Sequence, residues 1–405
     1  MQRLWCIVSL ATLTLASCSR TKTGAVGVTP DTIRVGMIGD LSGPLAFLGQ
    51  EISAGARLYF QHVSDQGGIH GRKIKFLVED DGYQPPRTLA ACRKLLDRDQ
   101  VLCLIGTVGT ATTLAIEPVL QNERVPLVAP MTWSSVVYDP PRRYIFGFGA
   151  TYRMQSWVML NYIRDHFRGV KPRIGVVYQD DDFGQDGLKG VREAAAYYGL
   201  DLAAAEGYKR GATDFSTQLL NLKRAKATHV ILWTVLREAA AVLKEARQLD
   251  WRPRFLGNHT FADDKIVELA GEAARNLLVL TFGDVWAGTQ RMTFYREVNR
   301  RYTPSHTPRM LHAGGFVVAQ GLVEALKRAG KDVNREKLVE AAESFREWDE
   351  NVFGTPLTYG PDQRISPVTQ LLLARADVGQ KRLVADPEPI RFRMPADWSK
   401  VGRKD

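Results

Sequence analysis

The sequence contains few of the residues that build metal centres or disulfide frameworks. Among 405 residues there are four cysteines and seven histidines, and the dispersed histidines include no zinc motif of the HExxH type. Basic residues outnumber acidic ones by 54 to 44, but they form no run long enough to bind nucleic acid, which we therefore do not expect as a partner. A solvated basic surface accounts for the net charge of +10.

Motifs that carry catalysis or bind phosphate are also missing. No G-x-S-x-G nucleophile turn occurs. The Gly/Thr-rich loop at 106–113 lacks both the lysine of a P-loop and the complete glycine set of G-x-G-x-x-G. The run DDDFG at 180–184 begins like a calcium loop, but Val191 occupies the position that needs a bidentate glutamate. We therefore expect a protein that is not an enzyme and that uses no metal and no cofactor.

The amino terminus carries an export signal. Arg3 precedes an uncharged stretch that ends at Ser17; it is too short to span a bilayer as a helix and is typical of a signal peptide. The letters LASC, which end at Cys18, resemble the lipobox of bacterial lipoproteins. We expect residues 1–17 to be removed, Cys18 to be lipidated and residues 18–30 to form a polar, lipidated tether. A plain signal peptide that contains a cysteine is the alternative.

Two cysteines remain in the body of the chain. Cys92 lies in a predicted helix and Cys103 in the strand predicted to follow it. Because an exported protein enters an oxidising compartment, a disulfide between the two thiols is one expectation. Two small, buried, unbridged side chains are the other, since free cysteine behaves as a small hydrophobic residue. The sequence leaves both open.

Beyond residue 30 the chain alternates between short apolar strands and longer helical patterns. Strands are predicted at 33–39, 73–80, 101–106, 125–130, 172–180, 228–235 and 276–282, with helices at 49–68, 85–99, 187–199 and 237–250. This alternation predicts β-α-β units and parallel sheets that are buried on both faces. The length favours two domains, and the pattern restarts after 146–152. We therefore predict an α/β fold with two doubly wound, Rossmann-like lobes.

Polar and aromatic side chains follow several of the predicted strands, where open α/β sheets bind their ligands. Thr110, Thr112 and Thr113 stand at a predicted helix start, whose unpaired N–H groups and hydroxyls suit a carboxylate, although one threonine could merely cap the helix. Residues at the corresponding strand ends of both series are predicted to line a cleft between the lobes. The candidate ligand-binding residues are Ser42, Phe47, Thr110, Thr112, Thr113, Thr132, Trp133, Ser134, Phe183, Val235, Leu236 and His259.

Several strings of residues resemble one family when they are taken in order. They include GGIHGRKI (67–74), EDDGYQP (79–85), GTVGTATT (106–113), VPLVAP (125–130) and QDDDFGQDGLKG (179–190). Over about residues 31–375 the sequence resembles the leucine/isoleucine/valine-type substrate-binding proteins of bacterial ABC transporters. The resemblance implies the type I periplasmic-binding fold, in which two lobes joined by three hinge crossovers close on a ligand.

The resemblance also implies how the chain is divided. Lobe 1 would comprise residues 31–148 and 284–369, and lobe 2 residues 149–283 and 370–395, with 396–405 as a C-terminal tail. The crossovers would then fall near Gly149, Gly283 and Gln370.

The same resemblance implies roles for individual residues. Thr112, Thr113 and Thr132 would clamp a ligand carboxylate together with neighbouring backbone. Phe183 would stand where the family often has a tyrosine, and Phe47 would line the pocket from the first lobe.

One departure from the family concerns the ligand. Amino-acid-binding members carry a glutamate, which pairs with the ligand ammonium, in the loop that here reads GNHTF (257–261). His259 stands in its place, and an imidazole cannot replace a carboxylate there. We therefore expect an apolar or aromatic carboxylate, or a small amide, rather than a branched-chain amino acid. The alternative is a local shift of the alignment, with Glu238 or Asp263 supplying the acid.

These inferences predict the extracytoplasmic solute-binding component of an ABC uptake system. It would be a monomer that captures a small carboxylate-bearing or amide ligand and delivers it to a permease and ATPase complex. The lipid on Cys18 would hold it at a membrane, in the periplasm or on the outer cell face. A lipid-anchored ligand sensor that feeds a receptor or regulator is the alternative function.

Overall fold

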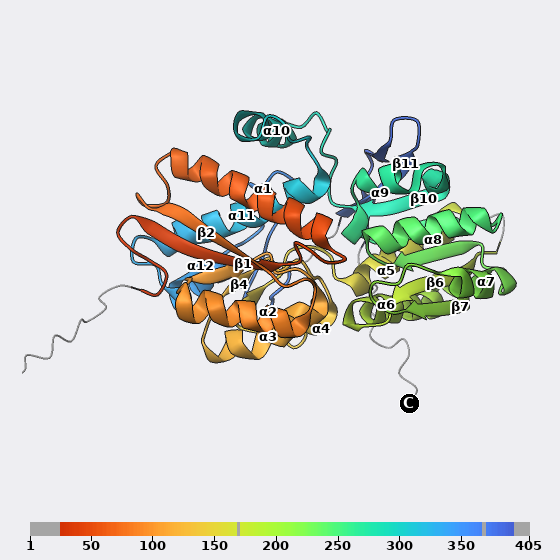
Figure 1. Ribbon diagram of the computed structural model, residues 1–405, viewed down its shortest axis with the longest axis horizontal. Helices are drawn as coiled ribbons and strands as arrows, with labels where there is room; N and C mark the ends of the chain where they lie inside the picture. The colour runs from red at the N-terminus through yellow and green to blue at the C-terminus, as the bar shows by residue number, and fades with distance from the viewer. Residues whose placement is uncertain (1–24, 168–170, 367–369, 393–405) are drawn as a thin grey trace, which may run out of the picture.

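The computed structural model describes residues 25–167, 171–366 and 370–392, which form two α/β lobes side by side (Figure 1). The sheet of lobe 1 has the order β2-β1-β3-β4-β5 and is parallel throughout. Chain order reverses between β1 and β3, which makes the sheet doubly wound. Its strands are β1 (Thr32–Gly39), β2 (Lys73–Asp80), β3 (Cys103–Ile105), β4 (Leu127–Val128) and β5 (Ile145–Phe146).

The sheet of lobe 2 repeats this winding. The parallel part runs β7-β6-β8-β9-β10, and β11 and β12 extend it in antiparallel fashion beyond β10. Its strands are β6 (Arg173–Gln179), β7 (Asp201–Tyr208), β8 (His229–Trp233), β9 (Arg254–Gly257), β10 (Leu277–Thr281), β11 (Gln370–Asp377), β12 (Arg382–Ala385) and β13 (Ile390–Arg391). The predicted α/β fold with two doubly wound lobes is confirmed.

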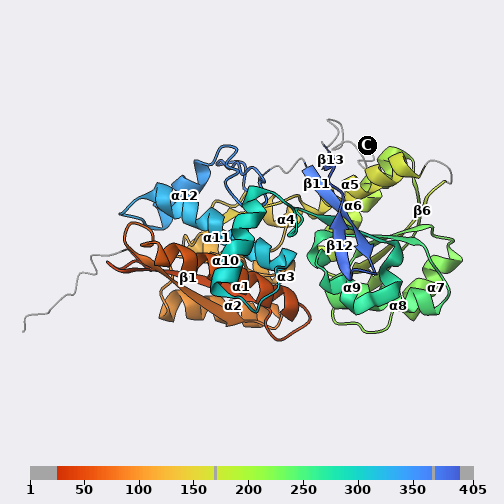
Figure 2. The ribbon, with the colours of Figure 1, turned by 90° about the horizontal axis from the view of Figure 1, so that it is seen from above.

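Helices cover both sheets, and three of them return late in the chain to lobe 1. There α10 and α11 lie beside α1 (Figures 1 and 2). The helices of lobe 1 are α1 (Ala46–Asp65), α2 (Pro85–Arg93) with a π-helical turn (Lys94–Arg98), α3 (Thr110–Asn122), α4 (Ser135–Tyr138), α10 (Gln290–Tyr302), α11 (Met310–Ala329) and α12 (Arg335–Glu343). Those of lobe 2 are α5 (Tyr152–His166), α6 (Asp182–Tyr198), α7 (Ser216–Arg224), α8 (Leu236–Gln248) and α9 (Lys265–Ala270), with 3-10 turns η2 (His259–Phe261) and η3 (Gly271–Asn276).

The chain passes between the lobes three times. It leaves the first sheet after β5, returns after β10 and enters the second sheet again at β11. Three crossovers agree with the expected fold. With these connections, the carboxyl ends of the parallel strands in the two sheets face each other.

The end of the predicted tether is already part of lobe 1. The Gly27 carbonyl accepts a hydrogen bond from Arg34 N at 2.8 Å, and Val28 forms an antiparallel bridge with Ile33. Gly27 is buried against the backbone of Leu102. The tether prediction was therefore too long at its C-terminal end. The signal peptide, Cys18 and the tail at 396–405 lie outside the described residues.

The two cysteines of the body are free thiols, so the disulfide left open by the sequence is not formed. Cys103 packs in the main core of lobe 1. Cys92 packs with Leu104 in a second cluster. Because neighbouring residues of a strand point to opposite faces of the sheet, Cys103 points away from the face that Cys92 covers. Burial raises the pKa of both thiols to about 12.

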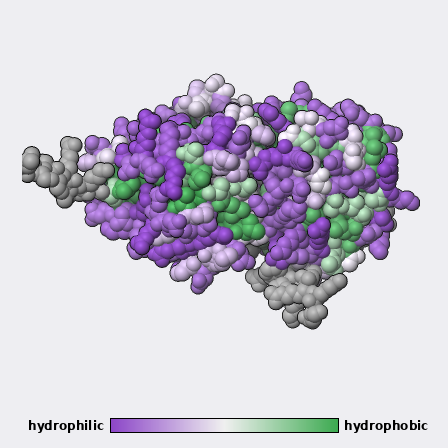
Figure 3. Space-filling view, turned by 60° about the horizontal axis from the view of Figure 1, so that its bottom comes forward, coloured by the Kyte–Doolittle hydropathy of each residue, from purple (hydrophilic) through white to green (hydrophobic). Residues whose placement is uncertain are grey.

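The surface is largely polar. Figure 3 shows one hydrophilic face on which apolar residues occur in small groups. Within the described ranges, the exposed large apolar side chains come from separate places in the chain, namely Val26, Leu89, Val136, Tyr197, Leu220 and Trp286. None of the described helices has the length and apolar character needed to cross a membrane.

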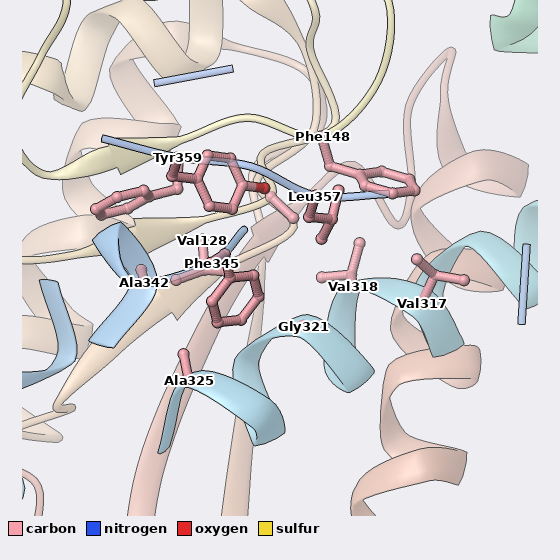
Figure 4. Close-up of a pocket in the computed structure, with 12 residues that line it drawn as sticks. Val128, Phe148, Val317, Val318, Gly321, Ala325, Ala342, Phe345, Leu357 and Tyr359 are labelled. Carbon is pink, nitrogen blue, oxygen red and sulfur yellow. The ribbon is translucent and has the colours of Figure 1, made fainter. Parts of the chain in front are cut away.

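The core of lobe 1 contains an apolar cavity between the sheet, α11 and the segment that follows α12 (Figure 4). Its lining includes Phe148, Val318, Gly321, Phe345 and Leu357. No charged side chain lines it, and the Tyr359 hydroxyl, which belongs to a lining residue, already donates to the Gly147 carbonyl at 2.9 Å, so no free polar side chain would orient a ligand. We treat it as a packing defect of the core.

Two glycines of α11 should respond to alanine in opposite directions. A Cβ at Gly315 would lie 2.0 Å from the Ile52 carbonyl oxygen of α1, whereas a Cβ at Gly321 would meet only Leu357 Cδ1, at 4.0 Å. Gly321→Ala should raise the free energy of unfolding by about 1 kcal/mol through helix propensity. Gly315→Ala should lower it by about 1–3 kcal/mol through overpacking. Urea unfolding measures both, and equal effects would contradict the close approach of the two helices.

Candidate active cleft between the lobes

A narrow cavity lies between the lobes. Lobe 1 contributes residues that follow β1 to β4, and lobe 2 contributes Tyr152 at the start of α5 and residues that follow β6, β8 and β9. Most of the wall is apolar, with four hydroxyls among the side chains. The lining residues are Leu45, Leu48, Tyr83, Val108, Gly109, Thr110, Met131, Tyr152, Phe183, Val235 and Thr260.

The cavity lies at the points where both sheets reverse their strand order. In lobe 1 that point separates β1 from β3, whose following loops supply Leu48 and Thr110. In lobe 2 it separates β6 from β8, which are followed by Phe183 and Val235. Ligands of doubly wound sheets bind in this crevice, because the adjacent loops turn to opposite faces and leave a space. Here two such crevices face each other.

The N-terminus of α3 forms the polar side of the cavity. The first N–H of this helix that bonds back to the chain is that of Thr113, to the Gly109 carbonyl at 3.2 Å, so the preceding N–H groups are available to an acceptor. The Thr110 hydroxyl lies 2.8 Å from that of Thr132, and the Tyr152 hydroxyl donates to Thr132 Oγ1 at 3.4 Å. Burial raises the pKa of Tyr152 to about 12, so it remains a hydrogen-bond donor.

The hydroxyls of Thr112 and Thr113 do not reach the cavity. The Thr112 hydroxyl donates to the Val108 carbonyl at 2.5 Å, and the Thr113 hydroxyl donates to the Gly109 carbonyl at 2.7 Å. Both side chains are buried against their own helix turn, a bond that Ser and Thr often form in helices. A hydroxyl whose proton is used in this way cannot donate to a ligand carboxylate. The predicted clamp is therefore wrong for these two hydroxyls.

Tyr83 shapes the cavity from the loop after β2. Its backbone has φ of 61°, a left-handed conformation that is rare for a bulky residue and costs about 1–3 kcal/mol. Asp81 holds it there, because its Oδ1 accepts the Tyr83 N–H at 2.9 Å while its Oδ2 accepts the Thr88 hydroxyl at 2.8 Å. The ring lies against Gly109, whose added Cβ would be 2.4 Å from Tyr83 Cε2. Gly109, with φ of 98°, admits the ring because it has no side chain.

An aromatic stack closes the back of the cavity across the lobe boundary. The rings of Trp133 and His259 are stacked with centroids 3.7 Å apart, and Phe282 meets the indole edge-on at 4.5 Å. His259 Nδ1 lies 2.9 Å from Gln155 Oε1, and Gln155 Nε2 donates to the Ala150 carbonyl at 2.8 Å. The amide orientation is thereby fixed, so His259 donates from Nδ1. Burial lowers the pKa of His259 well below its ordinary value, which makes the ring neutral.

The structure places the twelve candidate residues in three groups. Thr110, Phe183 and Val235 line the cavity, and Thr132, Trp133 and His259 support it from behind. The other six lie elsewhere: Ser42 is exposed and bonds Asp80, Phe47 lies under Arg309, Ser134 is buried beside Asp186, Leu236 packs in the core of lobe 2, and Thr112 and Thr113 bond their own helix.

Neither acid that could have replaced the missing glutamate faces the cavity. Glu238 is buried on α8, where burial raises its pKa and the Gly211 N–H is a partner. Asp263 is buried against Arg309, whose Nη1 lies 3.1 Å from its Oδ1. No Asp or Glu is among the lining residues, all of which belong to the described chain. The same described chain contains no cluster of three or more metal-ligating side chains.

Sequence reasoning missed several lining residues, of which Tyr83 and Tyr152 are the most polar. Tyr83 follows the acidic pair Asp80–Asp81 at the end of β2 after one glycine, the same strand-end position that identified Thr110. Tyr152 opens α5 just after the first crossover. Strand-end position was therefore a usable signal for both, whereas Leu45 and Leu48 depend on where α1 begins.

The family model described as Periplasmic binding protein matches residues 32–381. The chain belongs to the periplasmic binding protein family. The leucine-, isoleucine-, valine-, threonine- and alanine-binding protein of Pseudomonas aeruginosa is 24% identical over 248 residues, 61% of this chain and 66% of that protein. The Leu/Ile/Val-binding protein of Escherichia coli K12 is 24% identical over 250 residues, 62% of this chain and 67% of that protein. The match thus spans about two thirds of the length of these relatives.

Solved structures of this family share the fold. A branched chain amino acid ABC transporter from Thermus thermophilus with bound valine aligns with a TM-score of 0.81 at 22% identity, covering 92% of this chain and 99% of that chain. A fatty acid ABC transporter substrate-binding protein from Thermomonospora curvata aligns with a TM-score of 0.81 at 24% identity, covering 91% and 95%. The expected resemblance to leucine/isoleucine/valine-type proteins is confirmed at the level of family and fold.

The neutral His259 ring predicts a pH dependence of stability. Because the pKa of His259 is lowered in the folded protein, its stabilising contribution is present above the ordinary histidine pKa of about 6.5 and is lost as the pH falls below it. Between pH 7.5 and 5.5, wild type should lose about 1.4 kcal/mol more free energy of unfolding than His259→Gln. The other buried histidines contribute equally to the pH dependence of wild type and of the variant, so they cancel in the comparison. Parallel pH profiles in urea unfolding would refute the assignment.

Proposed function

We propose that this protein is the extracytoplasmic solute-binding component of an ABC uptake system, and that it captures a small monocarboxylate or amide with an apolar body. One observation carries the choice of ligand: the cavity combines hydrogen-bond donors with apolar walls and contains no acid. Membership of the periplasmic binding protein family supports the binding role. Export and a lipid at Cys18, as the amino terminus predicts, would keep the protein beside its permease.

The donors of the cavity suit an oxygen that carries negative charge. Thr110 lines the cavity at the start of α3, where the first N–H groups have no backbone acceptor and the helix dipole adds partial positive charge. Leu48, Met131, Phe183 and Val235 form apolar wall around the remaining space. A ligand that fits has one carboxylate or amide group at the α3 end and a branched aliphatic or aromatic body elsewhere.

An ammonium group would find no counter-charge in this cavity. The loop that carries His259 presents a neutral imidazole whose Nδ1 proton is already donated to Gln155. Neither Glu238 nor Asp263 lines the cavity, and Asp263 pairs with Arg309. Burying an uncompensated charge costs several kcal/mol, so an α-amino acid should bind far more weakly than the acid that lacks its amino group.

Similarity to solved structures does not identify the ligand class of this protein. Of two similarly close structures, one has bound valine and the other is named for fatty acid transport. Proteins of this fold therefore serve different solutes, and the side chains of the cavity decide. Closure on the ligand would act by population shift, since residues of both lobes line one cavity and only the closed form presents them together.

Leucine and 4-methylpentanoate test the ligand class, because they differ only by the amino group. We expect 4-methylpentanoate to bind with a dissociation constant at least about 100-fold below that of leucine, which corresponds to about 2.7 kcal/mol. Isothermal titration calorimetry on the delipidated, refolded protein measures both, and phenylacetate and isovaleramide extend the series. Tighter binding of leucine would overturn the assignment.

Two isosteric substitutions on α3 test which hydroxyl faces the ligand. Thr110→Val removes a donor that lines the cavity and should weaken binding of the best-bound acid about tenfold, the usual value of a bond to a charged group. Thr113→Val is the matched control, because its hydroxyl is committed to the Gly109 carbonyl; it should leave the affinity within about twofold of wild type. The reverse order of effects would show that the other face of α3 meets the ligand.

A further inference from the structure

A cluster of lobe 2 residues contacts Tyr83 and does not itself line the cavity. Arg210, two residues beyond the end of β7, places its guanidinium carbon 3.9 Å from the centre of the Tyr83 ring. Its Nη1 donates to the Tyr83 carbonyl at 2.7 Å, and its Nη2 donates to Asp181 Oδ2 at 2.7 Å. Arg210 thus contacts both the ring and the backbone of a residue in the other lobe.

The hydroxyl end of Tyr83 is held by the same lobe. Gln179 Nε2 donates to the Tyr83 hydroxyl oxygen at 3.2 Å and to Asp181 Oδ2 at 2.6 Å. Gln179 and Tyr83 are almost fully buried. Because Asp181 accepts hydrogen bonds from both Arg210 and Gln179, one carboxylate orients the two side chains that contact Tyr83.

Asp181 also connects this cluster to the cavity wall. It caps α6, with its Oδ1 accepting the N–H groups of Phe183 and Gly184 at 3.1 and 3.4 Å. Phe183 lines the same cavity as Tyr83. The carboxylate therefore fixes one lining residue of lobe 2 directly and one lining residue of lobe 1 through Arg210.

We propose that Arg210 is a positioning residue for solute capture, which clamps Tyr83 in the closed form and so sets how long the lobes stay closed. This inference rests on the proposed function. Arg210 is not among the cavity-lining residues, so it contributes through Tyr83 and not by touching the ligand. Its contacts to Tyr83 join two lobes and must break when they separate, whereas its bond to Asp181 remains within lobe 2.

The fork geometry of arginine matters for this role. Two guanidinium nitrogens reach different acceptors while the planar face lies on the ring, an arrangement that a lysine ammonium cannot reproduce. The lysine variant should therefore keep the charge but lose part of the clamp. Arg252 offers a matched control, because it is exposed, lies in lobe 2 and pairs only locally with Asp250 at 3.1 Å.

Hydrogen exchange on the full-length protein tests the clamp without any ligand. The amides of 106–113, at the cavity, should exchange about tenfold faster in Arg210→Met than in wild type, with Arg210→Lys between them and Arg252→Met unchanged. Amides of β1 report the fold and should not change. Equal exchange of 106–113 in wild type and Arg210→Met would overturn the proposal. Faster exchange in β1 as well would also overturn it, because Arg210 would then stabilise the fold as a whole.

A second readout uses 4-methylpentanoate as the probe. Its dissociation, measured by stopped flow, should be about tenfold faster from Arg210→Met than from wild type, with partial rescue in Arg210→Lys. An unchanged dissociation rate would contradict the clamp. Failure of the probe to bind wild type would count against the proposed ligand class alone, since the exchange comparison decides the role of Arg210 without a ligand.

Discussion

The site depends on the direction in which two parallel sheets present their strand ends. Each sheet reverses its order next to its first strand, between β1 and β3 in one lobe and between β6 and β8 in the other. The loops at each reversal diverge and leave a crevice. Three crossovers hold the lobes so that the two crevices face each other, and the cavity is the shared space. Single residues that line it, such as Thr110 and Phe183, take their places from this geometry.

The absence of charged side chains in the cavity lining restricts the class of ligand more than the fold does. An unpaired charge in a buried cavity costs desolvation free energy, so the polar groups of the cavity determine which ligands can bind. Here hydroxyls and helix N–H groups supply donors, and a neutral histidine stands at the one loop where the family resemblance implies an acid. Trp133 and Gln155 keep that ring stacked and hydrogen-bonded, and burial disfavours its protonation.

The sequence predicted the architecture well because strand and helix periodicity is local. Strands that are buried on both faces of the sheet, such as β1, β6 and β8, were recognisable from their apolar runs alone. Strand β7, with the small residues DLAAAEGY, lacks that signal and was missed. The C-terminal helices that return to lobe 1 were also not foreseen, since their places depend on packing against α1.

The site was predicted less completely, for reasons that lie in backbone geometry. Helix α1 begins at Ala46, three residues earlier than expected, because Asp40 accepts the N–H groups of Gly43 and Leu45 and compacts the loop. That shift turns Leu45 and Leu48, rather than Phe47, toward the cavity. The positive φ of Tyr83 and the backward bonds of Thr112 and Thr113 likewise depend on contacts that no local pattern reports.

Two carboxylates also make contacts between the lobes, and desolvation opposes both contacts. Asp186 of lobe 2 accepts the N–H of Ser135 in lobe 1 at 2.8 Å as well as its hydroxyl, yet burial raises the pKa of Asp186 despite these donors. The desolvation of that carboxylate thus offsets what its hydrogen bonds contribute. The pair of Arg309 with Asp263 faces the same opposition, because Asp263 is buried. Because desolvation opposes such contacts, the free energy that holds the lobes closed comes mainly from the solute and from the Arg210–Tyr83 contacts.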